Sequence, residues 1–95
     1  MDCLNFEYST HAVKRMLEKG ISGFEVEQTV LFGDVVQNYE SDKPYPSKLL
    51  LKFVKERPIH VVVARDQENS SCIIITCYLP DPEIWNEDFK TKRKL

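Results

Sequence analysis

Two histidines stand where they could act as general acid and general base. His11 follows a serine and a threonine at the start of an amphipathic pattern, and His60 begins the β-branched run "HVVVA". An unperturbed imidazole titrates near neutral pH, so each ring can give or take a proton under physiological conditions. Each histidine also has a plain structural interpretation, His11 as a solvated residue of a first helical turn and His60 as a hydrogen-bonded residue of a sheet.

Cationic and hydroxyl side chains accompany the histidines. Arg15 lies four residues after His11, so the guanidinium and the imidazole share a helical face that could bind a phosphate. Tyr78 offers a hydroxyl for a phosphate oxygen or a ring for stacking on a base. An ordinary solvated face, or a ring that covers the core, would explain the same residues. The catalytic candidates are His11, His60, Arg15 and Tyr78, and the RNA-binding candidates are Lys14, Lys48, Lys52 and Thr76.

Common signatures of metal-dependent and nucleotide-dependent enzymes are absent from the sequence. It contains no HExxH, no Gly-rich phosphate loop, no GxSxG and no close pair of histidines with metal-ligand spacing. Cleavage of RNA can proceed without them, because the 2′-hydroxyl is the nucleophile and the protein supplies only a base, an acid and cations around the phosphate. We therefore expect no metal and no cofactor, and the residues above could supply the parts that such a cleavage needs.

The composition indicates one small domain that spans residues 1–95. With a net charge of -2, a site for a polyanion has to be a local patch. The run "KTKRKL" forms a basic tail over residues 90–95. No apolar run reaches the roughly 18 residues that a membrane span needs, and the first residues do not resemble a signal peptide, so we expect a cytoplasmic protein that does not contact membranes.

Three cysteines, an odd number without a CxxC pair, indicate reduced thiols rather than a disulfide framework or a zinc site. Cys72 and Cys77 lie five residues apart in one strand pattern. Strict alternation would put them on opposite faces, so they cannot bridge each other.

The elements that must position these residues are two helices and four strands. Apolar periodicity predicts one helix over about residues 10–19, and a capping box of Ser22 and Glu25 begins a second helix that ends at Gly33. The run 4–8 could be a short first strand or an arm. Trp85 and Phe89 favour a short closing helix or a packed tail. Four strand patterns cover residues 34–40, 47–55, 58–66 and 70–79. Short links join the last three, which indicates antiparallel neighbours and a β-meander.

The expected fold is therefore α+β, with an N-terminal helical hairpin packed on one face of a four-stranded antiparallel sheet. If each strand turns its more apolar side toward the helices, Leu49, Leu51 and Phe53 face the core. The other face would then be half covered. It would gather His60, Thr76, Tyr78, Lys48 and Lys52.

From about residue 7 to residue 85 the chain resembles the family called domain of unknown function 4258. The resemblance rests on Ser9, His11 and Ala12, on Arg15, on Gly20 and Ile21, on the run from His60 to Val62, and on Thr76 and Tyr78. That family looks like part of the RelE/ParE-like toxin superfamily, whose members place a helical hairpin on an antiparallel sheet and often act as RNases opposed by an antitoxin. Such RNases are usually basic, whereas this chain is mildly acidic.

The resemblance implies a single RelE/ParE-like domain that is a toxin-like, metal-independent endoribonuclease with a protein antitoxin as partner. Under this hypothesis His11 and His60 converge at the sheet edge, one as base and the other as acid. Arg15 and Lys52 hold the phosphate while Tyr78 orders it. The alternative is a non-catalytic protein-binding module of the same fold, which docks an antitoxin or a gyrase-type partner through a sheet edge or the helices.

Overall fold

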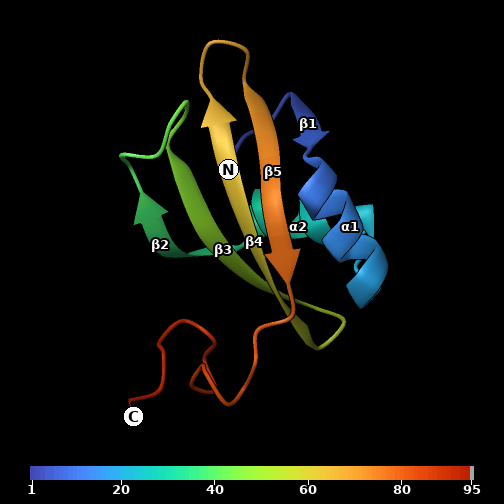
Figure 1. Ribbon diagram of the computed structural model, residues 1–95, viewed down its shortest axis with the longest axis vertical. Helices are drawn as coiled ribbons and strands as arrows, with labels where there is room; N and C mark the ends of the chain where they lie inside the picture. The colour runs from blue at the N-terminus through green and yellow to red at the C-terminus, as the bar shows by residue number, and fades with distance from the viewer. Residues whose placement is uncertain (95) are drawn as a thin grey trace.

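Two helices pack on one face of a five-stranded mixed sheet in the computed structural model, which describes residues 1–94 (Figure 1). Along the sheet the strand order is β1-β5-β4-β3-β2. Neighbours from β2 to β5 are antiparallel, whereas β1 runs parallel to β5. The elements are β1 (Asn5–Tyr8), α1 (Thr10–Lys19), α2 (Gly23–Phe32), β2 (Asp34–Tyr39), β3 (Ser47–Val54), β4 (Arg57–Asp66) and β5 (Ser71–Tyr78).

The α+β class is confirmed, but the expected sheet was wrong. Residues 5–8 form β1, which pairs Phe6 with Cys72 and Tyr8 with Ile74 and so makes the sheet five-stranded and mixed. The helices therefore lie between β1 and β2 in the chain rather than at its beginning. The run 4–8 was recognised as a possible strand, but nothing local in a sequence shows that a four-residue strand pairs with a segment more than 60 residues away.

After β5 the chain continues as an irregular C-terminal segment, residues 80–94, and forms no closing helix. One isolated bridge joins Trp85 to Lys92 and folds the segment back on itself. In Figure 1 this segment, drawn in orange to red, lies at the end of the sheet where β5 stops. Leu95, the last residue of the predicted basic tail 90–95, lies outside the described residues.

Both helices begin and end where their capping residues predict. The Ser9 hydroxyl accepts a hydrogen bond from the Ala12 amide at 2.9 Å and donates one to the Ile75 carbonyl at 2.8 Å, so it caps α1 and ties it to β5. At the other end Gly20 has a φ of 65°, a left-handed conformation that favours glycine. None of the helices within residues 1–94 has the length and the apolar character that a membrane crossing requires.

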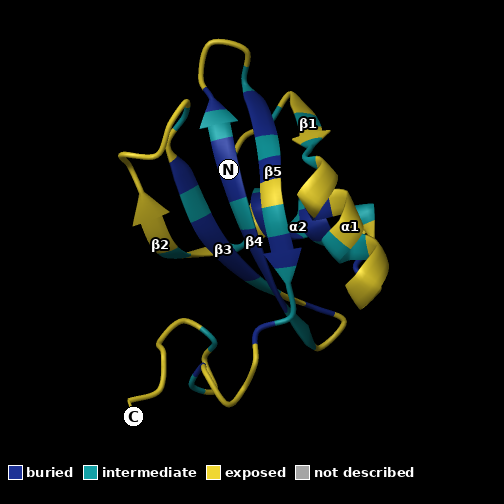
Figure 2. Ribbon diagram, in the orientation of Figure 1, coloured by how far each residue is buried: buried dark blue, intermediate teal, exposed yellow. Residues whose placement is uncertain are grey.

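The hydrophobic core lies between the helices and the sheet. Val26 and Val30 of α2 meet Val61 and Ile74 of the sheet there, and all four are fully buried. Figure 2 shows the buried residues along the central strands, while α1 and much of the C-terminal segment are exposed. We call the sheet face opposite the helices the open face.

The sides of β3 are the reverse of those expected. Leu50 pairs with Val61 in the register, so it faces the helices with the core. Leu49, Leu51 and Phe53 therefore lie on the open face. The expectation was wrong because β3 is covered on both faces: Leu49 and Leu51 on the open face are each only 3% exposed, so the more apolar side of the strand need not be the side that faces the helices.

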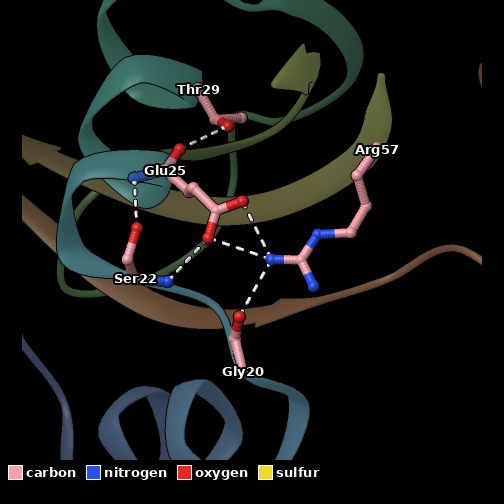
Figure 3. A network of polar contacts seen from close by, with 5 residues as sticks. All are labelled: Gly20, Ser22, Glu25, Thr29 and Arg57. Atoms are coloured by element: carbon pink, nitrogen blue, oxygen red, sulfur yellow. Dashed lines mark hydrogen bonds and ion pairs between the residues drawn. The ribbon is translucent and has the colours of Figure 1, made fainter. Parts of the chain in front are cut away.

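An ion pair and a helix cap form one polar network at the start of β4 (Figure 3). Arg57 Nη2 lies 2.9 and 2.8 Å from the two carboxylate oxygens of Glu25 and donates to the Gly20 carbonyl at 2.9 Å. The Ser22 amide donates to the Glu25 carboxylate and the Glu25 amide to the Ser22 hydroxyl, which confirms the predicted capping box. Arg57 thereby joins β4 to the junction between the two helices.

The Glu25 carboxylate should make stability depend on pH. Burial by itself raises the pKa of Glu25, but the hydrogen bonds from Ser22 and Arg57 outweigh it, and the net effect is a lowered pKa. The ionised group thus stabilises the fold above the unfolded pKa, and this stabilisation is lost as the pH falls through the folded value. We expect Glu25→Gln to lower the free energy of unfolding by about 1 kcal/mol at pH 7.

That deficit should shrink as the pH falls below 4.5, the ordinary pKa of a glutamate. Urea unfolding at several pH values measures it. Glu18→Gln, on the exposed side of α1, is the matched control. An equal deficit for Glu25→Gln at pH 7 and pH 3 would contradict the ionic role of Glu25.

A disulfide joins Cys3 to Cys72, with Cα atoms 5.6 Å apart, so the expectation of three reduced thiols was wrong. The parallel pairing of β1 with β5 brings these distant cysteines together. Cys77 is a free and buried thiol. Cys72 and Cys77 both face the core, because a register irregularity between Val62 and Val63 breaks the alternation along β5.

Loss of the disulfide should destabilise the fold, because the bridge closes a loop across a sequence separation of 69 residues. The chain-entropy model assigns such a loop about 4 kcal/mol. We expect a reductant to lower the midpoint of thermal unfolding, and Cys3→Ser to lower it equally and remove the sensitivity to reductant. The same midpoint with and without reductant in the wild-type chain would contradict this prediction.

Candidate functional site

A groove on the open face separates the sheet from the C-terminal segment and has a volume of about 500 Å³. Three of its residues are aromatic, two are lysines, and none is acidic. On a chain with a net charge of -2, the two lysines make this a local cationic patch, although Lys90 is paired with Asp34, which is not among the lining residues. We call it the aromatic groove, and its lining residues are Val36, Gln37, Tyr39, Leu49, Tyr78, Trp85, Lys90, Thr91 and Lys92.

Aromatic contacts hold the C-terminal wall of the groove against the sheet. The Trp85 ring packs edge-on against His60, with ring centroids 4.7 Å apart, and only 8% of the residue is exposed. Phe89 packs edge-on against Phe53 at 5.8 Å. Lys92 places its ammonium 5.7 Å from the centre of the Trp85 ring, within the range of a cation–π interaction.

His60 lies beneath the groove, fully buried, with a partner for each ring nitrogen. Its Nε2 is 2.7 Å from the Phe89 carbonyl oxygen and its Nδ1 is 3.1 Å from the Tyr78 hydroxyl. A carbonyl can only accept, so Nε2 carries the proton, and Nδ1 of the neutral ring accepts from Tyr78. Burial lowers the pKa of His60, and the Phe89 carbonyl offsets this only in part, so the neutral form is favoured.

Tyr78 connects His60 to the groove. Burial raises the pKa of the Tyr78 hydroxyl, and nearby Tyr39 raises it further, so the hydroxyl stays protonated at neutral pH. Tyr78 lines the groove while its hydroxyl donates to the basic nitrogen of His60. A group bound in the groove could therefore pass a proton to the Tyr78 oxygen as Tyr78 passes its own proton to His60.

Of the predicted site residues, His60, Tyr78 and Thr76 come together on the open face. His60 pairs with Tyr78 across β4 and β5, and Thr76 pairs with Val62 on the same side. The other candidates lie elsewhere. His11 and Lys14 are exposed and Arg15 is half-buried on α1, which packs against β5 from the helix side, so the structure does not bring His11 to His60.

The two lysines of β3 also lie apart from His60, contrary to the expected faces. Lys48 pairs with Val63 and Lys52 with Ile59, so both point to the helix side of the sheet. Lys48 borders another hollow of about 640 Å³, which is also lined by Asp2 and Glu40. That hollow has charges of both signs and lacks the aromatic rings of the groove.

Of the nine lining residues only Tyr78 was predicted as a site residue, and the aromatic and cationic ones that were missed are Tyr39, Trp85, Lys90 and Lys92. A signal was present in the interleaving of aromatic and basic residues in "WNEDFKTKRK". Trp85 and Phe89 were interpreted there as packing residues, and the basic run as a separate tail. Among residues 1–94, no three His, Cys, Asp or Glu side chains are grouped so that they could hold a metal ion.

The buried His60 should make stability fall under mildly acidic conditions. Because its pKa is lowered in the folded state, the unfolded chain binds the proton more readily, and stability is lost as the pH falls below the unfolded value of about 6.5. Urea unfolding followed by the fluorescence of Trp85, the single tryptophan, should show a midpoint that drops between pH 7.5 and pH 5.

His60→Gln should flatten this dependence, whereas His11→Gln, which removes the exposed histidine, should retain it. An unchanged slope in His60→Gln would mean that another group is responsible.

The family model for domain of unknown function 4258 matches residues 8–79. Neither a curated protein nor a solved structure matches the chain. The matched range includes His60 and Tyr78, while Trp85, Lys90 and Lys92 lie beyond it. Because the match covers most of its length, the chain belongs to the family domain of unknown function 4258.

Proposed function

We propose that the protein binds single-stranded RNA in the aromatic groove and cleaves it without a metal ion, as a relative of the RelE/ParE-like toxins. The observation that carries the proposal is the groove itself, where three aromatic rings and two lysines meet in a lining without acidic residues, and where one of the two lysines, Lys90, is paired with a carboxylate, that of Asp34. Bases stack on aromatic side chains, and lysines attract the phosphates between them. The net negative charge of the chain does not oppose this, because the cations are concentrated locally.

In the proposed reaction Tyr78 and His60 act together as the base. The 2′-hydroxyl proton passes to the Tyr78 oxygen while the Tyr78 proton passes to His60 Nδ1, 3.1 Å away. The 2′-oxygen forms a bond to phosphorus, the bond from phosphorus to the 5′-oxygen breaks, and the 5′-oxygen takes a proton from water. The products are a 2′,3′-cyclic phosphate and a 5′-hydroxyl. Lys92 would stabilise the negative charge that develops on the phosphate oxygens.

His60 is a positioning residue in this scheme because the enclosing side chains keep it from the substrate. The Phe89 carbonyl holds the ring in the tautomer whose Nδ1 can accept, at 2.7 Å from Nε2. His11 and Arg15 have no part in this site, so the roles differ from those expected for a pair of converging histidines.

The test is cleavage of a fluorescently labelled single-stranded RNA, with binding measured separately. We expect Tyr78→Phe to slow cleavage by a factor of about 100 or more and to leave the dissociation constant within about twofold. Lys92→Ala should weaken binding and should reduce the slope of log K against log salt concentration by about 1, the value for one lost phosphate contact. Lys14→Ala, the same change on α1, should alter neither.

Equal effects of Lys14→Ala and Lys92→Ala would place the RNA elsewhere. Cleavage by Tyr78→Phe at the wild-type rate would contradict the relay.

A second candidate function is that of a protein-binding module for an antitoxin or a gyrase-type partner. Exposed apolar side chains on the helices favour it, since Leu17 is 81% and Phe24 62% exposed. Induction in a bacterial host distinguishes the two functions. Growth arrest with new RNA ends, relieved by Tyr78→Phe, supports the RNase. Arrest without new ends that is relieved by Leu17→Asp supports the protein partner.

A further inference from the structure

A second hollow of about 410 Å³ adjoins the aromatic groove at the edge of the sheet. It lies where β3 continues beyond its partner, because β2 begins with the pair Asp34 and Leu51 and leaves Lys52 and Phe53 without a neighbour on that edge. We call it the phenyl hollow, and its lining residues are Phe32, Asp34, Leu51, Lys52, Phe53, Asp88 and Lys90.

Two phenylalanine rings are exposed in the phenyl hollow. Phe32, the last residue of α2, is 65% exposed, and Phe53 is 48% exposed. The Phe89 ring meets Phe53 edge-on, with an interplanar angle of 65°, and so supports it from the C-terminal segment. Apolar rings gathered in a hollow and left open to solvent are typical of a binding surface.

Two carboxylates and two lysines line the phenyl hollow, so its formal charges cancel. Both carboxylates already have partners, and for this reason the hollow suits a phosphate backbone better than the count of charges suggests. Asp34 is paired with Lys90 at 3.0 Å. The Asp88 carboxylate accepts hydrogen bonds from the amides of Lys90 and Thr91 and from the Thr91 hydroxyl, so it serves the loop itself. Among residues 1–94, no carboxylate lies within 4.0 Å of the Lys52 ammonium, which leaves this cation available.

We propose that the phenyl hollow is a second base-stacking subsite for the same RNA strand, with Lys52 at a phosphate. This rests on the proposed function. Lys90 borders both the aromatic groove and the phenyl hollow, so a strand that leaves the groove past Lys90 enters the hollow directly. The phenyl rings offer no hydrogen-bonding groups, so the subsite accepts any base and lengthens the bound RNA without adding sequence preference.

The experiment compares short and long RNA on the full chain that carries Tyr78→Phe, so that the RNA stays intact. Fluorescence anisotropy measures the dissociation constants of a dinucleotide and an octanucleotide of mixed sequence. Phe32→Ala should weaken octanucleotide binding about fivefold or more and leave dinucleotide binding unchanged, because one stacked base is lost. Lys52→Ala should act in the same direction and also reduce the salt dependence.

Phe24→Ala is the matched control, because Phe24 is an equally exposed phenylalanine, at 62%, near the other end of α2. It should leave both RNAs bound as before, and circular dichroism checks that each variant is folded. Octanucleotide binding unchanged in both Phe32→Ala and Lys52→Ala would overturn the subsite while leaving the aromatic groove intact. Equal weakening by Phe24→Ala would also overturn it. If the parent chain binds neither RNA, the proposed function itself fails.

Discussion

The open face depends on the need of one buried imidazole for two hydrogen-bonding partners. Because His60 is fully buried, a ring nitrogen without a hydrogen-bonding partner would destabilise the fold by more than the burial of the ring stabilises it. Tyr78 satisfies one nitrogen from β5, and the Phe89 carbonyl satisfies the other from the C-terminal segment. The same contacts bring Trp85 over the ring and so build one wall of the aromatic groove. A requirement of folding thus creates the surface on which we place the function.

The two faces of the sheet differ in composition. On the helix side, aliphatic residues such as Val61 and Ile74 pack without exposure, and the Glu25 and Arg57 ion pair joins the helices to β4. On the open side, the buried Leu49 and Leu51 lie beside aromatic and hydroxyl side chains, and the cations come from the C-terminal segment. A small domain buries few apolar residues, and each of them matters for stability. A site on the face away from the helices leaves the packing between the helices and the sheet undisturbed.

Much of the local structure could be predicted from the sequence. Ser9, Ser22 and the glycines that follow each helix mark the helix boundaries through local capping, and short links between apolar runs indicate the antiparallel strands. Residue type singled out His60 and Tyr78 as candidates. It did not predict that Trp85 packs on His60 or that Lys92 lines the same groove as Tyr78, because the C-terminal segment carries no periodic pattern that shows where it docks. His11 and Arg15 share a helical face as predicted from their spacing, but spacing cannot tell which side of the sheet that helix covers.

By itself the sequence determined the α+β class, the two capped helices and the antiparallel run from β2 to β5. These features follow from interactions between residues a few positions apart. Only the tertiary structure decided that β1 pairs with β5, that Cys3 bonds to Cys72, and that Leu50 rather than Leu49 faces the core. It also decided that the C-terminal segment covers His60. Such choices depend on contacts between residues far apart in the chain, where several arrangements satisfy the same local pattern and only packing of the whole domain selects one.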